Sequence, residues 1–487
     1  MNTSSSETIR PVFGKILLLF VIPVLFTLSC ATGTPPAGVP AELPADGTPE
    51  AAKAAEPEPT DTPAILAKIA ALLGKEEYDG ALALFDRIDP ADAETADIRL
   101  LKASALGSAG RTDDARAIVA DVSSREPDNM DALYVLSALE GGTGKDRERK
   151  NILERIVKTD PKYVKALVDL GNLAFGGTRA LTTAAGYFDR ALREEPDNRD
   201  ALVGRAQVYR YSRDPKNAER LLNRAVRLYP QWAGPLHERA RLYRGAGYPV
   251  QAMEDIDKAK ALEPGNYWIA VDRGGILLDL NRKQESLEEF SRAVALDPGS
   301  FIAYVYTAGI KDEFGDYEGA ERDYTTLTKL RPEYYFAFEG LGVLKMRKQL
   351  WAEARDNFLE AYRQAPKEPG YALLAAMNWM RAGRQNDPRQ FLETALRRVE
   401  RESPDWYLLR LYHDLAGDND IVIRLDREKN LDTKAKSLYY LAHYYDIRGN
   451  KSLADKYFLQ VKDLDRRAIP EWRLNELALE ERDLKAF

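Results

Sequence analysis

Small and large apolar residues recur at fixed positions between residues 199 and 366. One position is small and is occupied by Ala206, Ala240, Gly274, Ala308 and Gly342. A second position is large and is occupied by Leu222, Ile256, Phe290, Tyr324 and Phe358. Two helices approach closely only where the side chains between them are small, because a larger group there costs about 1–3 kcal/mol. The pattern therefore predicts antiparallel helix pairs, with large residues filling the gaps between neighbouring pairs.

Prolines divide this pattern into units of equal length. Pro230, Pro264, Pro298, Pro332 and Pro366 follow one another at intervals of 34 residues. Proline has no backbone N–H to donate to the preceding turn, so each one is expected to end the second helix of its pair. Asn266 and Ser300 each come shortly after a proline and can cap the helix that follows. Each unit is thus predicted to be a helix–turn–helix.

This period and these residues resemble the tetratricopeptide repeat family, whose helix pairs stack side by side. The resemblance implies an all-α fold, a right-handed α-solenoid of about twelve units. Pro388 stands where a small residue is usual, which predicts a late start for that second helix. We expect degenerate units over residues 64–198, five regular units over 199–368, degenerate units over 369–465 and a C-terminal capping helix over 466–487.

An apolar run from Ile16 to Leu28 follows two basic residues near the start of the chain. It is shorter than the roughly 20 residues of a membrane-spanning helix and is typical of a signal-peptide core. Cys30, the only cysteine, follows this run after Ser29, an arrangement that resembles the bacterial lipoprotein signal. The resemblance implies a signal peptide over residues 1–29 and a lipid on Cys30. An ordinary cleaved signal and an uncleaved anchor are the alternatives.

Residues 30–63 are rich in Pro, Ala, Gly, Thr and Glu and almost lack large apolar side chains. Such a segment cannot bury enough surface to fold, so a disordered tether is predicted between the lipidated cysteine and the repeats. The protein is therefore expected in the cell envelope, anchored by lipid to a membrane and facing the periplasm. Ala31 replaces the Asp that retains some bacterial lipoproteins at the inner membrane, which favours the outer membrane.

The sequence contains no recognisable catalytic or cofactor motif, so no catalytic residue, metal ligand or cofactor is predicted. His237, His413 and His443 lie far apart and lack metal-binding spacing. The segment 141–145 lacks the first glycine and the final Ser or Thr of a phosphate loop and is interpreted as a turn. The net charge of −7 is opposite to the basic stripe of nucleic-acid-binding proteins, so no nucleic-acid partner is expected.

In the tetratricopeptide repeat family, four positions of each first helix line the concave surface. Carried over to this sequence, they predict a groove in two stretches. The first stretch is basic and polar and consists of Gln207, Arg210, His237, Arg241 and Arg244. The second is apolar and consists of Trp268, Val271, Leu278, Ile302, Val305, Phe336, Val343, Met346, Leu373, Met377 and Met380, interrupted by Asp312, Glu313 and Glu339. Packing between neighbouring first helices is the alternative explanation for any single one of these residues.

Such a groove is expected to bind a protein or peptide segment, with Met and aromatic side chains giving adaptable apolar contact. Together with the predicted anchor, it favours a membrane-anchored scaffold that assembles or positions a complex in the bacterial cell envelope. An alternative is an accessory lipoprotein for solute uptake that binds a small hydrophobic ligand. An enzyme is the least favoured interpretation, because the repeats leave little room for a catalytic domain.

Overall fold

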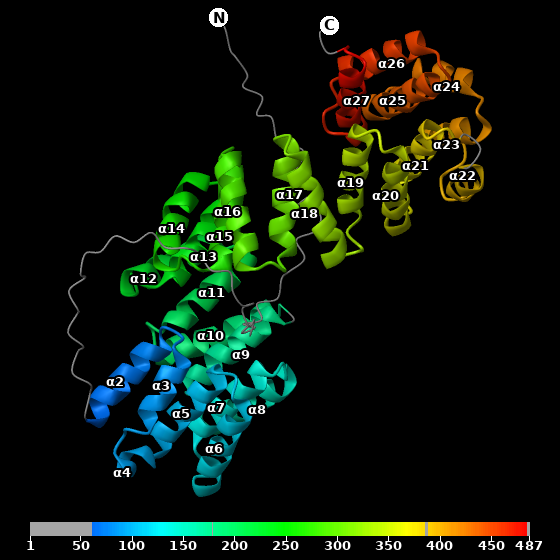
Figure 1. The fold of residues 1–487 in the computed structure, drawn as a ribbon. Helices are drawn as coiled ribbons and strands as arrows, with labels where there is room; N and C mark the ends of the chain where they lie inside the picture. Colours follow the sequence, from blue (N-terminus) through cyan, green and yellow to red (C-terminus); the bar gives the residue numbers. More distant parts are fainter. Residues whose placement is uncertain (1–60, 178, 385–387, 485–487) are drawn as a thin grey trace, which may run out of the picture. The chain divides into compact units, whose positions relative to one another are not determined.

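A computed structural model describes residues 61–484 apart from residues 178 and 385–387. The predicted signal peptide over 1–29, Cys30 and nearly all of the predicted tether lie outside the described residues. All regular structure within the described part is helical, in 26 helices. These helices fall into two compact units, which divide between Leu262 and Glu263 and are treated separately below (Figure 1). The all-α prediction is confirmed.

The N-terminal unit contains the described residues up to Leu262. Its helices are α2 (Thr62–Leu73), α3 (Tyr78–Phe85), α4 (Pro90–Ala93), α5 (Ala96–Ser108), α6 (Thr112–Arg125), α7 (Met130–Gly142), α8 (Asp146–Thr159), α9 (Val164–Gly176), α10 (Leu181–Glu194), α11 (Arg199–Tyr211), α12 (Pro215–Leu228), α13 (Ala233–Gly245) and α14 (Pro249–Leu262). From α5 onward, each odd-numbered helix packs most closely against the helix that follows it, as expected for a stack of helical hairpins.

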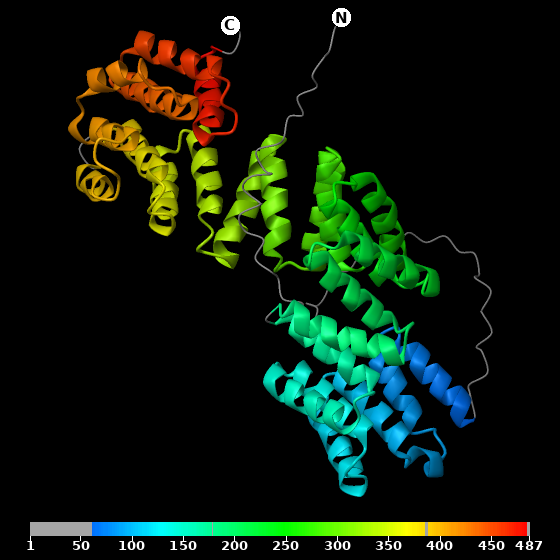
Figure 2. The ribbon, with the colours of Figure 1, turned by 180° about the vertical axis from the view of Figure 1, so that it is seen from behind.

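The C-terminal unit contains the described residues from Glu263 onward. Its helices are α15 (Tyr267–Asp279), α16 (Lys283–Leu296), α17 (Phe301–Glu313), α18 (Tyr317–Leu330), α19 (Tyr335–Arg347), α20 (Trp351–Gln364), α21 (Pro369–Arg381), α22 (Arg389–Leu396), α23 (Pro404–Asp414), α24 (Asp418–Leu425), α25 (Leu431–Ile447), α26 (Lys451–Asp463) and α27 (Pro470–Glu481). Three regular hairpins, α15–α16, α17–α18 and α19–α20, precede the shorter helices α22 and α24. Figure 2 shows the same elements from behind.

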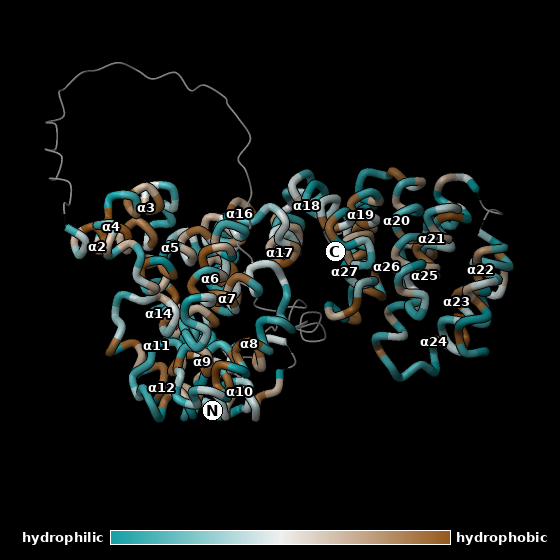
Figure 3. Tube along the Cα trace, turned by 90° about the horizontal axis from the view of Figure 1, so that it is seen from below, coloured by the Kyte–Doolittle hydropathy of each residue, from teal (hydrophilic) through white to brown (hydrophobic). Residues whose placement is uncertain are grey.

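The size pattern of the sequence is explained by how the hairpins pack. Phe358 on α20 lies against Gly342 on α19, and a Cβ added at Gly342 would be 2.7 Å from the Phe358 ring. Phe290 on α16 faces Gly274 on α15 in the same way, at 2.9 Å. Each aromatic ring is fully buried, so the small residue makes the room that the large one fills. Figure 3 shows the resulting alternation of apolar and polar stretches within the helices.

Helix ends follow the predicted signals. The Asn266 side chain accepts a hydrogen bond from the backbone N–H of Trp268 at 3.0 Å, and Ser300 accepts one from Ala303 at 3.2 Å. Helix α22 begins at Arg389, directly after Pro388, as the proline predicts. Between the helices of a hairpin the chain passes through a left-handed residue, for example Gly315 with φ 80°, which glycine adopts without strain.

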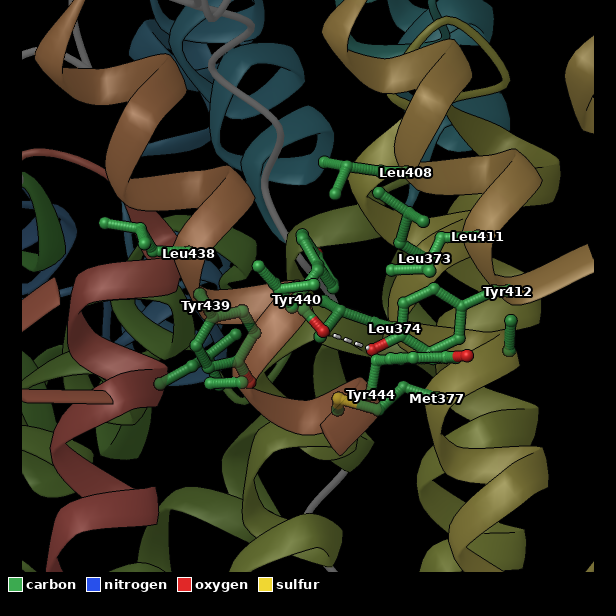
Figure 4. Close-up of a cluster of buried hydrophobic side chains, with 14 of the residues drawn as sticks. Leu373, Leu374, Met377, Leu408, Leu411, Tyr412, Leu438, Tyr439, Tyr440 and Tyr444 are labelled. Atoms are coloured by element: carbon green, nitrogen blue, oxygen red, sulfur yellow. Dashed lines mark hydrogen bonds between the residues drawn. The ribbon is translucent and has the colours of Figure 1, made fainter. Parts of the chain in front are cut away.

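The helices from α21 onward share one buried core with α19 and α20, and within it α25 has several neighbours besides its hairpin partner α26. Helix α25 packs on α21, α23, α26 and α27. Tyr412 on α23 donates a hydrogen bond to the backbone oxygen of Tyr440 on α25 at 2.9 Å, amid buried leucines (Figure 4). Leu474 and Leu479 on α27 are buried in this core. The C-terminal helix therefore buries one face in the unit.

Candidate functional site

The predicted apolar stretch lies on the first helices of the C-terminal unit, but its residues differ in exposure. Trp268, Leu278, Ile302, Val305, Phe336 and Val343 are half-buried, whereas Val271, Met346, Leu373, Met377 and Met380 are buried. The half-buried group comes from α15, α17 and α19. We call these six half-buried residues the apolar inner face.

Helix α21 does not contribute to the apolar inner face. Leu373, Met377 and Met380 belong to the same buried cluster as side chains of α23 and α25, and Figure 4 shows Leu373 and Met377 beside Tyr412 and Tyr440. The sequence prediction placed these three residues on an open surface. The structure corrects it, because the chain's own C-terminal helices cover them.

Helix α27 reaches the inner side of α17 and α19 through two ion pairs. Nη2 of Arg473 lies 2.6 Å from Oδ2 of Asp312 on α17. Nη1 of Arg347 on α19 lies 3.1 Å from Oε2 of Glu480 at the other end of α27. Asp312, one of the three acidic residues that interrupt the predicted apolar stretch, is therefore paired with an arginine of the C-terminal helix.

A pocket of about 400 Å³ opens beside the start of α27. Its walls come from α19, α21, α23, α25 and α27 and combine apolar groups with carboxylates. Glu339 on α19 accepts a hydrogen bond from the Tyr371 hydroxyl at 2.6 Å. Burial raises the pKa of Glu339 and the pKa of Glu471 above their usual values. Of the residues that line this pocket, the sequence had singled out only Glu339, as an interruption of the groove.

The predicted basic stretch lies in the N-terminal unit and is organised around a buried acid. Glu238 on α13 accepts from Arg210 at 3.3 Å and from Arg241 at 3.0 Å. Burial alone would raise the pKa of Glu238, but the guanidinium groups of Arg241 and Arg210 bring that pKa below its usual value. His237 is buried and Arg244 is half-buried. This stretch is therefore less basic than its arginines suggested, because Glu238 offsets part of their charge.

The other two histidines, His413 and His443, each contact a charged side chain of the protein. Nδ1 of His443 lies 2.8 Å from Nη2 of Arg381 inside the C-terminal core, and Nδ1 of His413 lies 2.6 Å from Oδ1 of Asp414. The described residues contain no group of three or more His, Cys, Asp or Glu side chains placed to hold a metal ion. No helix in the described part of the chain is long and apolar enough to cross a membrane.

Two tetratricopeptide repeat families match the sequence, one at residues 72–139 and the other at residues 168–233 and 311–369. The matched segments coincide with the stacked hairpins of both units. These three segments of the chain match tetratricopeptide repeats. This result confirms the repeat prediction, and the packing of consecutive helix pairs agrees with a tetratricopeptide repeat solenoid.

Several shorter proteins of known structure are similar to parts of this chain. PilF of Pseudomonas aeruginosa is 18% identical, with 43% of this chain and 94% of PilF covered at a TM-score of 0.39. PilW, a type IV pilus biogenesis factor, is 18% identical, with 44% of this chain and 98% of PilW covered at a TM-score of 0.39. YrrB, a tetratricopeptide repeat protein with an unusual peptide-binding site, is 17% identical, with 38% of this chain and 96% of YrrB covered at a TM-score of 0.31. The search of curated proteins gave no match.

Proposed function

We propose that this protein is a membrane-anchored scaffold of the bacterial cell envelope that binds protein or peptide segments on the apolar inner face. Tetratricopeptide repeats generally bind protein or peptide partners. The observation that carries the proposal is the row formed by Trp268, Ile302 and Phe336, which occupy the same position in three successive repeats and remain half-buried. A bound segment would complete their burial.

The chemistry of this row suits a polypeptide. Large aromatic and aliphatic side chains supply most of the binding free energy at protein interfaces when they become desolvated. Successive hairpins place one such side chain per repeat, so a helix or an extended segment could contact several of them at once. Val305 and Val343 lie on the same two helices, α17 and α19, as two members of the row and widen the apolar surface.

The test is recovery of a partner from solubilised envelope with the full-length chain as bait. The variant Ile302→Glu places a charge on the apolar inner face, whereas Leu296→Glu places the same charge on an exposed residue of α16. We expect a stoichiometric protein to copurify with the wild type and with Leu296→Glu, and to be lost with Ile302→Glu. Retention of that protein by Ile302→Glu, in a chain with unchanged helicity, would contradict the proposal.

The membrane anchor is supported by the sequence. The apolar run before Cys30 is too short to span a membrane and has the length of a signal-peptide core. Acyl chains on Cys30 would hold the protein at a membrane, at about 0.8 kcal/mol per buried CH₂. Cells fed an alkyne fatty acid should label the wild type and leave Cys30→Ser unlabelled and released from membranes. Labelling of Cys30→Ser would rule out this anchor.

Neither competing function gains support from the two pockets of the C-terminal unit. Both pockets carry several charged side chains, such as Asp405 and Lys436 in one and Arg424 and Asp420 in the other. A small hydrophobic ligand in either pocket would take water away from these charged groups without giving them a hydrogen-bond partner. Catalysis remains the least favoured interpretation, since tetratricopeptide repeats are typically non-enzymatic scaffolds.

A further inference from the structure

Two carboxyl groups converge on the pocket beside α27 without a cation between them. Glu339 comes from the inner side of α19, and Glu471 comes from the first turn of α27. Tyr371 donates a hydrogen bond to Glu339 at 2.6 Å, and Tyr440 donates one to Glu471 at 3.4 Å. The Glu471 side chain also accepts a hydrogen bond from its own backbone N–H. Neither carboxyl forms an ion pair within the described residues. Glu471 is only 7% exposed.

The cations around the pocket already have partners. Lys436, the basic residue of the pocket wall, lies 2.7 Å from Asp405. Arg466 lies 2.6 Å from Asp432, and Arg473 is held by Asp312. None of these cations forms an ion pair with Glu339, Glu471 or the exposed Glu368, and the charges of Arg473 and Lys436 only partly offset the effect of burial on Glu339 and on Glu471. The surroundings therefore carry an excess of negative charge.

A carboxyl that loses water without gaining a cation is unfavourable in its ionised form, and desolvation accordingly raises the pKa of the half-buried Glu339 and of the buried Glu471. A guanidinium or ammonium group placed between them would stabilise both carboxylates. The pocket volume of about 400 Å³ is ample for one long basic side chain. Apolar groups of Tyr371, Leu374 and Leu408 line the same pocket and could pack against its methylene stem.

The pocket adjoins the apolar inner face. Phe336 and Glu339 are three residues apart on α19, so their side chains lie on the same side of that helix. A segment lying over Phe336 would therefore pass the mouth of the pocket. The neighbouring pair of Arg473 with Asp312 shows that a carboxylate on this surface accepts an arginine.

We propose that the polypeptide bound on the apolar inner face inserts an arginine or lysine side chain between Glu339 and Glu471. This inference rests on the proposed function and specifies its partner: a segment with apolar residues and one basic residue among them. Arginine fits best, because its planar guanidinium can donate to two carboxylates at once.

The experiment is panning of a random dodecapeptide library on the immobilised full-length chain. The test variant is Glu339→Gln with Glu471→Gln, which removes both charges and keeps an acceptor for each tyrosine. The control is Glu333→Gln at an exposed residue between α18 and α19. Thermal melting should show that both variants fold.

We expect peptides retained by the wild type and by Glu333→Gln to carry Arg or Lys at one position, enriched about tenfold over the library. The double variant should still retain apolar peptides but lose this enrichment. Apolar peptides without basic enrichment on the wild type would overturn the inference and leave the proposed function standing. Basic enrichment that persists on the double variant would also overturn it. No retained peptide at all would contradict both.

Discussion

At the scale of single residues, the packing of a hairpin depends on reciprocal sizes at two facing positions. The glycines Gly274 and Gly342 face phenylalanine rings, whereas Ala206 stands in a unit whose large residue is Leu222. In the two phenylalanine units, glycine thus stands opposite the ring. The contact distances show that the glycine positions have no room for a methyl group without movement of the ring.

We predict that Gly342→Ala lowers the free energy of unfolding of the C-terminal unit by about 1–3 kcal/mol, because the new methyl overlaps the Phe358 ring. Phe358→Leu in the same chain should recover part of this loss. Urea denaturation followed by circular dichroism measures both. A Gly342→Ala chain as stable as the wild type would mean that the ring is free to move.

His443 is a buried residue whose ionisation would affect stability. Burial holds its pKa well below 6.5, and the nearby Arg381 and Arg482 lower it further. Asp446, which pairs with both arginines, holds them beside the imidazole. The neutral ring accepts a hydrogen bond from Arg381 through Nδ1, so a proton on that nitrogen would break the contact and add a third positive charge.

We predict that the stability of the C-terminal unit falls as the pH drops below about 6.5, since the unfolded chain then binds a proton that the folded chain does not. His443 changes the free energy of unfolding by at most about 1.4 kcal/mol per pH unit. His443→Gln should remove this slope. Glu339 and Glu471, with raised pKa values, act in the opposite sense, so the wild type and the variant must be compared at each pH. If the free energy of unfolding varies with pH identically in the wild type and in His443→Gln, His443 does not contribute to the pH dependence.

At the scale of elements, α27 joins the C-terminal core to the inner side of α17. Its apolar side chains face the core, and Arg473 extends away to Asp312. The Asp312 side chain is 6% exposed, whereas that of Arg473 is 58% exposed. The carboxylate is therefore the group that depends on the pair, because it has little water to replace the guanidinium.

We predict that Arg473→Ala destabilises the C-terminal unit by about 1–3 kcal/mol, the cost of leaving a buried charged group unsatisfied. Asp312→Asn added to this variant should restore most of the loss. Arg467→Ala, which removes an arginine from an exposed pair with Asp465, should change stability by less than about 0.5 kcal/mol. An equal effect of the two arginine substitutions would contradict this account.

At the scale of the whole molecule, most of the fold follows from local rules. Proline spacing, caps such as Asn266 and the size pattern act within one hairpin or between neighbours, so the sequence reveals them directly. The late start of α22 after Pro388 has the same local origin. These features explain why the helical stack could be predicted.

The surface available for binding was harder to predict, because it depends on contacts between distant parts of the chain. Arg473 and Asp312 are 161 residues apart, and Tyr440 reaches Gly370 from 70 residues away. No repeat pattern encodes such contacts, so Met377 was assigned to the groove although α25 covers its helix. The sequence showed Glu339 among apolar residues. That Glu339 lines a pocket became clear only from the structure, because α27 supplies part of the wall.

The most direct test of the central claim is photo-crosslinking of the full-length chain in native membranes from single benzoylphenylalanine positions. Position 336 lies on the apolar inner face, and position 330 replaces an exposed leucine at the end of α18. Our account predicts a protein cross-link from position 336, mapped to an apolar segment with a basic residue, and little from position 330. Cross-links from position 330 alone, or the same partner captured equally from both, would contradict it.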